Sequence, residues 1–336
     1  MELGGTPKFR AAIIALRAHL PVVLAHYSRR RENRGLRGCD HVMMADLKTV
    51  LDGGRYFEGP RWHRGRLWFV DCMARTLLSI SLSGELQQHA TVTDDTPCGL
   101  GVLPDGDIVV LTMFSKRLLR FADGKLSLYA DLSHIATGTI DDMIIDGQGR
   151  AYVGDLGFDL PPPEGRGAVG RIILVVPDGS ARVVADGLRF PNGIAVSSDH
   201  RRLVVAEMDG ACLADYEMAP DGGLHLRGRL GRMSDPDGIC LDRDGAVWVA
   251  SFTEGAFVRI GRDGVERQRI EVPGRRALAC ALGGADRSTR CSASARRPRM
   301  RSCGRASRSR GSMWSRSMCP ATATPEGVSS FSFCFE

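Results

Sequence analysis

Aromatic residues are scarce in this sequence, at 6% of its 336 residues. The shortage of aromatic side chains and the abundance of glycine, with 40 residues, disfavour long packed helices. The same composition favours many short strands joined by tight turns. Hydrophobic residues make up 43% of the chain, which is enough for a substantial core. We therefore expect a globular, all-β protein.

The central part of the sequence has no Cys-x-x-Cys pair and no cysteine spacing typical of a metal site. Five of the ten cysteines lie there: Cys72, Cys98, Cys212, Cys240 and Cys280. We expect them to be reduced, buried thiols of a cytoplasmic protein rather than disulfides.

A long uninterrupted hydrophobic run is also absent. Residues 11–27 are apolar, but Arg17, His19 and Pro21 interrupt them, and no convincing cleavage site follows. Regular patterning begins only after Met43-Met44. We expect residues 1–43 to be a non-native extension, disordered or helical, with an amphipathic helix or an export signal as alternatives. We expect no membrane association.

The formal net charge of +6 is unevenly distributed. Residues 1–43 hold eight Lys and Arg against three Asp and Glu, and residues 287–336 hold ten Arg against two Glu. The two ends therefore carry +5 and +8, which leaves −7 for residues 44–286. An acidic body argues against a nucleic-acid partner and fits a body that collects carboxylates around a cation.

The last fifty residues contain no Leu, Ile, Tyr, Lys, Asp, Asn, Gln or His after Arg287, and Ser and Arg dominate. Such a composition buries little apolar surface, so we expect residues 287–336 to be a disordered tail. A sharper hypothesis is that the natural reading frame is lost near Asp286. Reading the codons of residues 311–325 two bases later gives an alternating, strand-like sequence. The last unit of the fold would then lack strands.

One short phrase recurs six times between residues 44 and 286. The copies are Phe57-Glu58-Gly59-Pro60, Pro97-Cys98-Gly99-Leu100, Ile140-Asp141-Asp142-Met143, Pro191-Asn192-Gly193-Ile194, Pro236-Asp237-Gly238-Ile239 and Ala279-Cys280-Ala281-Leu282. Their second residues are 40, 43, 51, 45 and 43 positions apart, the period of a four-stranded propeller blade. A turn such as Arg64-Gly65 and then a strand follow the phrase, so each unit opens with a hairpin. The prediction is a six-bladed β-propeller.

The second residue of each phrase should face the central channel, because the innermost strand of every blade lines it. Four of these residues are oxygen donors: Glu58, Asp141, Asn192 and Asp237. Carboxylates that converge in a narrow channel repel one another unless a cation neutralises them, and oxygen donors select a hard cation. A single Asp or Asn beside glycine is usually only a turn former, but four at one phase of a repeat predict a metal site.

These segments resemble the ligand-bearing segments of the senescence-marker-protein-30/gluconolactonase family, over about residues 46 to 286. The resemblance implies a six-bladed propeller with one divalent cation, Ca²⁺ first and Zn²⁺, Mg²⁺ or Mn²⁺ as alternatives, held by Glu58, Asn192 and Asp237. Asp141 stands where the family has an Asn that adds to the site or contacts substrate. Thr139 stands where sugar-lactone members have an Arg, which puts aldonolactone specificity in doubt.

The resemblance implies hydrolysis of a small lactone. The metal would polarise the carbonyl, and Asp237, or secondarily Asp141, would take a proton from the attacking water. The segment with Asp155 and Phe158 lies in the longest spacing, so we expect it to border the channel mouth and, with Thr139, to help bind substrate. A solvated blade-edge loop is the alternative. Two rival functions stay open: a phosphotriesterase-like metal hydrolase resembling diisopropyl fluorophosphatase, and an inactive, truncated propeller.

Overall fold

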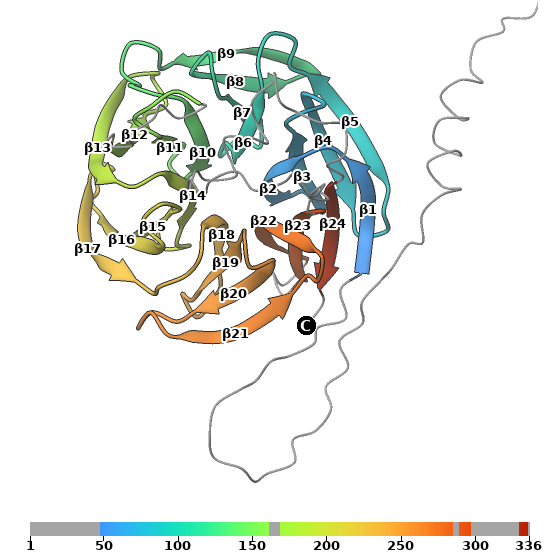
Figure 1. Ribbon diagram of the computed structural model, residues 1–336. Coiled ribbons are helices and arrows are strands. Elements are labelled where there is room, and N and C mark those ends of the chain that lie inside the picture. Colours follow the sequence, from blue (N-terminus) through green and yellow to red (C-terminus); the bar gives the residue numbers. More distant parts are fainter. Residues whose placement is uncertain (1–47, 161–168, 285–288, 297–328, 335–336) are drawn as a thin grey trace, which may run out of the picture.

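The structure is a computed structural model that describes residues 48–160, 169–284, 289–296 and 329–334. Every regular element in these ranges is a β-strand, and the strands form six four-stranded antiparallel sheets around a central axis (Figure 1). Within these ranges there is no helix with the length and apolar character needed to cross a membrane. The predicted all-β propeller is confirmed.

Five blades are each built from four consecutive strands, which run from the axis to the rim. The first contains β2 (Phe57–His63), β3 (Arg66–Asp71), β4 (Thr76–Ser81) and β5 (Leu86–Thr91), and the second β6 (Pro97–Val102), β7 (Ile108–Thr112), β8 (Arg117–Ala122) and β9 (Lys125–Asp131). The third contains β10 (Ile140–Ile145), β11 (Ala151–Asp155), β12 (Gly170–Val175) and β13 (Ala181–Leu188). The fourth contains β14 (Pro191–Val196), β15 (Arg202–Glu207), β16 (Cys212–Met218) and β17 (Leu224–Leu230), and the fifth β18 (Pro236–Leu241), β19 (Val247–Ser251), β20 (Ala256–Ile260) and β21 (Glu266–Glu271).

The remaining sheet is assembled from both ends of the described chain. Its order is β1-β24-β23-β22, with β22 (Arg275–Gly283) innermost, then β23 (Thr289–Arg296), β24 (Ser329–Cys334) and the outer strand β1 (Lys48–Gly54). The sequence predicted six blades of the same construction. Only five of the six sheets are blades of four consecutive strands, and the sixth is this composite sheet. Pairing of β1 with β24 joins the two ends of the described chain in one sheet, which closes the ring between the fifth blade and the first.

This composite sheet differs from two expectations. It has four strands, although the last unit was expected to lack some, and two parts of segment 287–336 are strands rather than disordered chain. The composition of the whole segment concealed the local alternation of Phe331 and Phe333 with serine, which is typical of a strand. The predictions for residues 1–43, and for the rest of the tail, fall outside the described residues.

The six innermost strands contact one another around the whole ring: β2 meets β6, then β10, β14, β18 and β22 follow, and β22 returns to β2. Each of these strands has a register irregularity at the recurring phrase. In β14, for example, Pro191 and Ile194 pair with β15, while the two residues between them do not. Such bulges redirect side chains, which explains why the phrase recurs at this place in every unit.

The glycine of the phrase allows neighbouring inner strands to approach closely. A Cβ at Gly193 would lie 2.5 Å from the carbonyl oxygen of Asp237, and one at Gly238 would lie 2.6 Å from Cβ of Ala279. Ala279 therefore occupies the third position of the sixth copy, and Leu278 occupies the second. The prediction that Cys280 occupies the second position of the sixth copy was therefore wrong by two residues.

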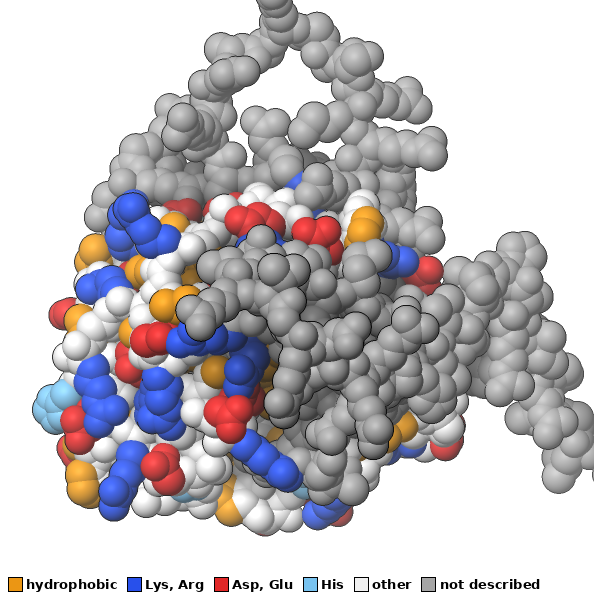
Figure 2. Space-filling model, turned by 90° about the horizontal axis from the view of Figure 1, so that it is seen from below, with side chains coloured by type: hydrophobic (Ala, Val, Ile, Leu, Met, Phe, Trp, Pro, Cys, Tyr) orange, Lys and Arg blue, Asp and Glu red, His pale blue; other side chains and the backbone are white. Residues whose placement is uncertain are grey.

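The outer parts of the blades carry acidic and basic side chains interspersed with isolated hydrophobic ones (Figure 2). Many are paired, as in the contacts of Arg120 with Asp105 and of Arg182 with Asp221. Exposed pairs of this kind stabilise a fold only slightly, so the stability of each blade depends mainly on its buried apolar faces.

Candidate functional site

Four oxygen-donor residues occupy the same place on four inner strands. Each is the second residue of its strand: Glu58 on β2, Asp141 on β10, Asn192 on β14 and Asp237 on β18. Their exposed fractions are only 8%, 4%, 3% and 0%. Burial of so many polar side chains at one level of the ring costs folding free energy unless hydrogen bonds or bound ions compensate it. The hydrogen-bond partners and charges around these four residues therefore show what the site can bind.

The carboxylates meet in the axial space of the ring. The pKa of Glu58 is raised well above its ordinary value, first by burial and then by the charges of Asp237 and Asp141. Those two residues lie on β18 and β10, which are not neighbours of β2 in the ring. Their charges therefore act on Glu58 across the ring rather than from an adjacent strand.

The raised pKa of Asp141 shows that burial in this arrangement disfavours a charged carboxylate. Burial, with a further contribution from the charge of Asp142, raises the pKa of Asp141 to about 8, while a hydrogen bond from Cys98 lowers it. Without a compensating cation, this carboxyl group is mostly protonated at neutral pH. The arrangement therefore favours either bound protons or a bound cation.

Several buried polar atoms at this level have no hydrogen-bond partner among the described residues: Oε1 of Glu58, Oδ2 of Asp141 and Nδ2 of Asn192. Carboxylate and amide oxygens are the donors that hard divalent cations prefer, so the donor set fits such an ion chemically. The side chains are not arranged as a finished site, however. Within the described ranges, no group of three or more His, Cys, Asp or Glu side chains has metal-binding geometry.

The other two inner strands contribute no oxygen donor. Cys98 is 2% exposed, and its thiol donates a hydrogen bond to the carbonyl oxygen of Asp141 at 3.3 Å. Leu278 on β22 is fully buried in the hydrophobic cluster that also contains Cys98. The β6 and β22 sides of the channel are therefore less polar than the sides that carry the four donors.

Asp142 replaces the glycine of the phrase in the third blade and connects three blades. Its Oδ1 accepts a hydrogen bond from Nη2 of Arg61 at 3.1 Å, and its Oδ2 accepts one from the backbone N–H of Ile194 at 3.3 Å. Arg61 and Asp142 are both largely buried, so the pair fixes β2 and β14 relative to β10. This pair could not be predicted, because nothing in a single sequence reveals that residues 61 and 142 are neighbours in the fold.

Asp155 and Thr139, two of the three residues expected to bind substrate, instead form hydrogen bonds to the backbone of the segments on either side of β10 and β11. The carboxylate of Asp155, fully buried, accepts hydrogen bonds from Thr137 N at 2.8 Å, Gly138 N at 2.9 Å and Gly157 N at 3.0 Å. Thr139 is also fully buried, and its Oγ1 accepts a bond from Leu160 N at 3.0 Å. Both residues position the segment after β11 and have little capacity left for a substrate.

Phe158, the third expected substrate residue, packs edge to face on Phe190 with 5.7 Å between ring centroids. Phe190 directly precedes β14, and the segment around Phe158 follows β11, so both lie at the end of the ring where the four donors begin their strands. They form an apolar wall between the third and fourth blades.

Tyr56 was not predicted to belong to the site. It is 7% exposed, and burial and the charges of Glu58 and Asp237 raise its pKa well above the ordinary value. Its position directly before the first phrase, two residues ahead of Glu58, was the available signal.

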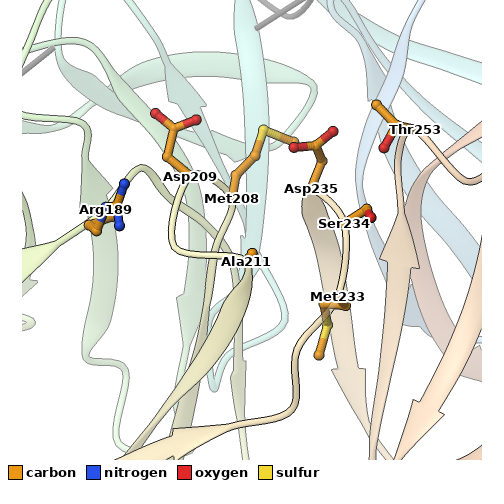
Figure 3. Close-up of a pocket in the computed structure, with 8 residues that line it drawn as sticks. All are labelled: Arg189, Met208, Asp209, Ala211, Met233, Ser234, Asp235 and Thr253. Atoms are coloured by element: carbon orange, nitrogen blue, oxygen red, sulfur yellow. The ribbon is translucent and has the colours of Figure 1, made fainter. Parts of the chain in front are cut away.

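A recess of about 630 Å³ opens at the same end of the ring, between the fourth and fifth blades. Figure 3 shows Arg189 and Asp209 on one side and Asp235, Ser234 and Thr253 on the other, with Met208 between them. Arg189 lies three residues before Asn192, and Asp235 lies two residues before Asp237. The recess therefore lies at the end of the ring where the donor strands β14 and β18 begin.

Comparisons with known proteins agree with this architecture. The sequence model of the SMP-30/Gluconolactonase/LRE-like region matches residues 57–296. Pentonolactonase XacC of Haloferax volcanii is 27% identical over 258 residues, which cover 72% of this chain and 82% of that protein. Regucalcin of Xenopus laevis is 26% identical over 241 residues, covering 69% and 80%.

Solved structures show the same fold. A gluconolactonase from Xanthomonas campestris superimposes with a TM-score of 0.64 at 24% identity, covering 82% of this chain and 95% of its own. A luciferin-regenerating enzyme superimposes with a TM-score of 0.66 at 17% identity, covering 86% and 94%. At these identities the likeness concerns the fold alone.

The raised pKa of Asp141 predicts an unusual pH dependence of stability when divalent cations are chelated. Between its ordinary pKa and about 8, the folded chain holds a proton that the unfolded chain has released, so stability falls as pH rises. We expect the free energy of unfolding in chelator to fall by about 2–4 kcal/mol from about pH 5 to about pH 8.

Urea unfolding across this pH range measures the effect. In the variant Asp141→Asn, which has no titratable group at this position, the fall should be clearly smaller. An identical pH profile for both proteins would contradict the assignment.

Proposed function

Because the chain belongs to the SMP-30/Gluconolactonase/LRE-like family, we propose that it hydrolyses a small lactone with the help of one divalent cation at the channel axis. The observation that carries this proposal is the burial of three mutually repelling carboxylates and one amide at the same offset of four inner strands. A structural core would not place such residues together, because their desolvation destabilises the fold unless a ligand compensates it. The substrate would be a small molecule.

The proposed cation is Ca²⁺. All four donors are oxygens from Asp, Glu or Asn, and no histidine is among them, which favours a hard ion over Zn²⁺. Mg²⁺ and Mn²⁺ share the preference for oxygen. Support for calcium also comes from a structural neighbour described as a calcium-binding protein, regucalcin from Agrobacterium tumefaciens, which superimposes with a TM-score of 0.62 at 22% identity and covers 76% of this chain and 87% of its own.

Glu58, Asp141, Asn192 and Asp237 would hold the cation, which would supply the Lewis acidity that polarises a lactone carbonyl. We assign the general base to Asp237, whose fully buried carboxylate faces Glu58 across the axis. It would take a proton from the attacking water, and the single ring-opened hydroxy acid would leave through the mouth. Asp141 is the second candidate, since a carboxyl with a pKa of about 8 lies close to a neutral working pH.

Substrate choice would depend on the mouth rather than on Thr139. Thr139 is fully buried and its Oγ1 accepts a hydrogen bond from Leu160 N, so this position offers no accessible polar group to a sugar hydroxyl. The neighbouring recess instead offers two carboxylates, a guanidinium and hydroxyl groups beside the methionine Met208. We propose that it receives a hydroxyl-bearing substituent of the lactone. Phe158 would contact the apolar face of the lactone ring.

The substitutions Asp237→Asn and Asn192→Ala test separately which residue takes the proton and which residue mainly binds the cation. Asp237→Asn should lower kcat by at least about 100-fold while calorimetric Ca²⁺ affinity changes much less, because the amide keeps an oxygen donor but cannot take a proton. Asn192→Ala should mainly weaken Ca²⁺ binding, and added Ca²⁺ should restore part of its turnover. If Asp237→Asn keeps the wild-type kcat and Asp141→Asn loses it, the base is Asp141.

The recess is tested with Asp235→Asn, compared with Asp123→Asn as a matched control. Both aspartates have a left-handed backbone, with φ of 42° and 49°, which asparagine tolerates, and Asp123 lies in the turn between β8 and β9. Asp235→Asn should raise KM for a glycosyl-substituted lactone about tenfold, several times more than for the unsubstituted lactone. Equal effects on both lactones, or the same effect from Asp123→Asn, would show that the recess does not contact substrate.

A further inference from the structure

Two cysteine thiols lie against each other on the inner strands of the fifth blade and of the composite sheet. Sγ of Cys240 on β18 and Sγ of Cys280 on β22 are 3.6 Å apart, with Cys240 as the hydrogen-bond donor. Both are free thiols in the structure, and they are the only sulfur–sulfur hydrogen-bonded pair among the five cysteines whose side chains it describes, which are Cys72, Cys98, Cys212, Cys240 and Cys280.

The surroundings of the two thiols differ. Cys280 is 7% exposed, and its thiol donates to the backbone carbonyl oxygen of Trp248 at 3.4 Å. The close contact with the Cys240 thiol and then burial raise the pKa of Cys280 well above its ordinary value, so Cys280 carries its proton before oxidation begins. Cys240 is half-buried and is the sulfur that a dissolved reagent can reach first.

We propose that Cys240 and Cys280 form a reversible disulfide that fastens the composite sheet to the fifth blade. An S–S bond is about 2.05 Å long, so the sulfurs must approach by about 1.5 Å, which rotations of the two side chains can supply. The oxidant is a small disulfide of the glutathione class. This site is independent of the four oxygen donors and of the proposed lactone chemistry.

The exchange takes two steps. The Cys240 thiolate attacks the small disulfide, forms a mixed disulfide and releases one small thiolate. Cys280 loses its proton to that thiolate, attacks Sγ of Cys240 and expels the second small thiolate, which takes up the proton that Cys240 gave to solvent. Two protein thiols are oxidised to one disulfide, and one small disulfide is reduced to two thiols.

The physical consequence concerns closure of the ring. β22 is the only innermost strand whose sheet is completed by strands from both ends of the described chain, and it contacts β18 directly. A bond between residues 40 positions apart restricts the unfolded chain and prevents β22 from separating from β18. Oxidation should therefore delay opening of the propeller at this joint.

The test is to incubate the full chain with oxidised glutathione and map its peptides by mass spectrometry without reduction. We expect a linked pair of peptides containing Cys240 and Cys280, lighter by about 2 Da than the sum of the two thiol peptides and separated by reductant. The melting temperature should rise by at least about 4 °C on oxidation and return on reduction.

Cys240→Ser, at the half-buried position, should abolish both the linked peptides and the rise in melting temperature. Cys212→Ala is the matched control, because Cys212 is a buried cysteine on β16 whose sulfur contacts Glu207 rather than another cysteine. It should behave like the wild type. A stable glutathione adduct on Cys240 without linkage to Cys280, or links formed only by other cysteines, would overturn the proposal.

Discussion

Mutual repulsion of buried carboxylates at the axis of the propeller is the constraint on which our account of this protein depends. Glu58, Asp141 and Asp237 come from blades far apart in sequence, yet the charges of Asp237 and Asp141 both raise the pKa of Glu58. The ring tolerates this repulsion because its stability comes from apolar faces between and within blades. A cation at the axis would convert the same repulsion into attraction, which is why we propose one.

The fold brings these residues together through local features of the inner strands. A bulge at each recurring phrase redirects the side chains, and a glycine after each donor except Asp141 lets the next strand approach. Asp142 is the exception: it uses its carboxylate to bond Arg61 and the backbone of Ile194. The third blade is thus joined to the first and the fourth by the hydrogen bonds of this carboxylate.

Much of this architecture could be predicted from the sequence, because a repeat of about 40 residues with a fixed phrase implies a ring of similar units. The four donors follow from the same phase argument. The composite sheet could not be predicted, since pairing of β1 with β24 is a contact between distant segments. The sixth copy was misplaced because Ala277 to Leu282 offers no glycine to fix the register. The structural roles of Asp155 and Thr139 could not be predicted either, because their hydrogen bonds to Thr137 N and Leu160 N depend on the backbone of the folded chain.

The most direct measurement for the central claim is lactone turnover and thermal stability of the full chain after exhaustive chelation, followed by titration with Ca²⁺. Our account predicts that chelation abolishes turnover and lowers the melting temperature, and that Ca²⁺ restores both at the same concentration. The reason is that one ion would serve the chemistry and neutralise Glu58, Asp141 and Asp237. Unchanged turnover in the metal-free protein would contradict the account.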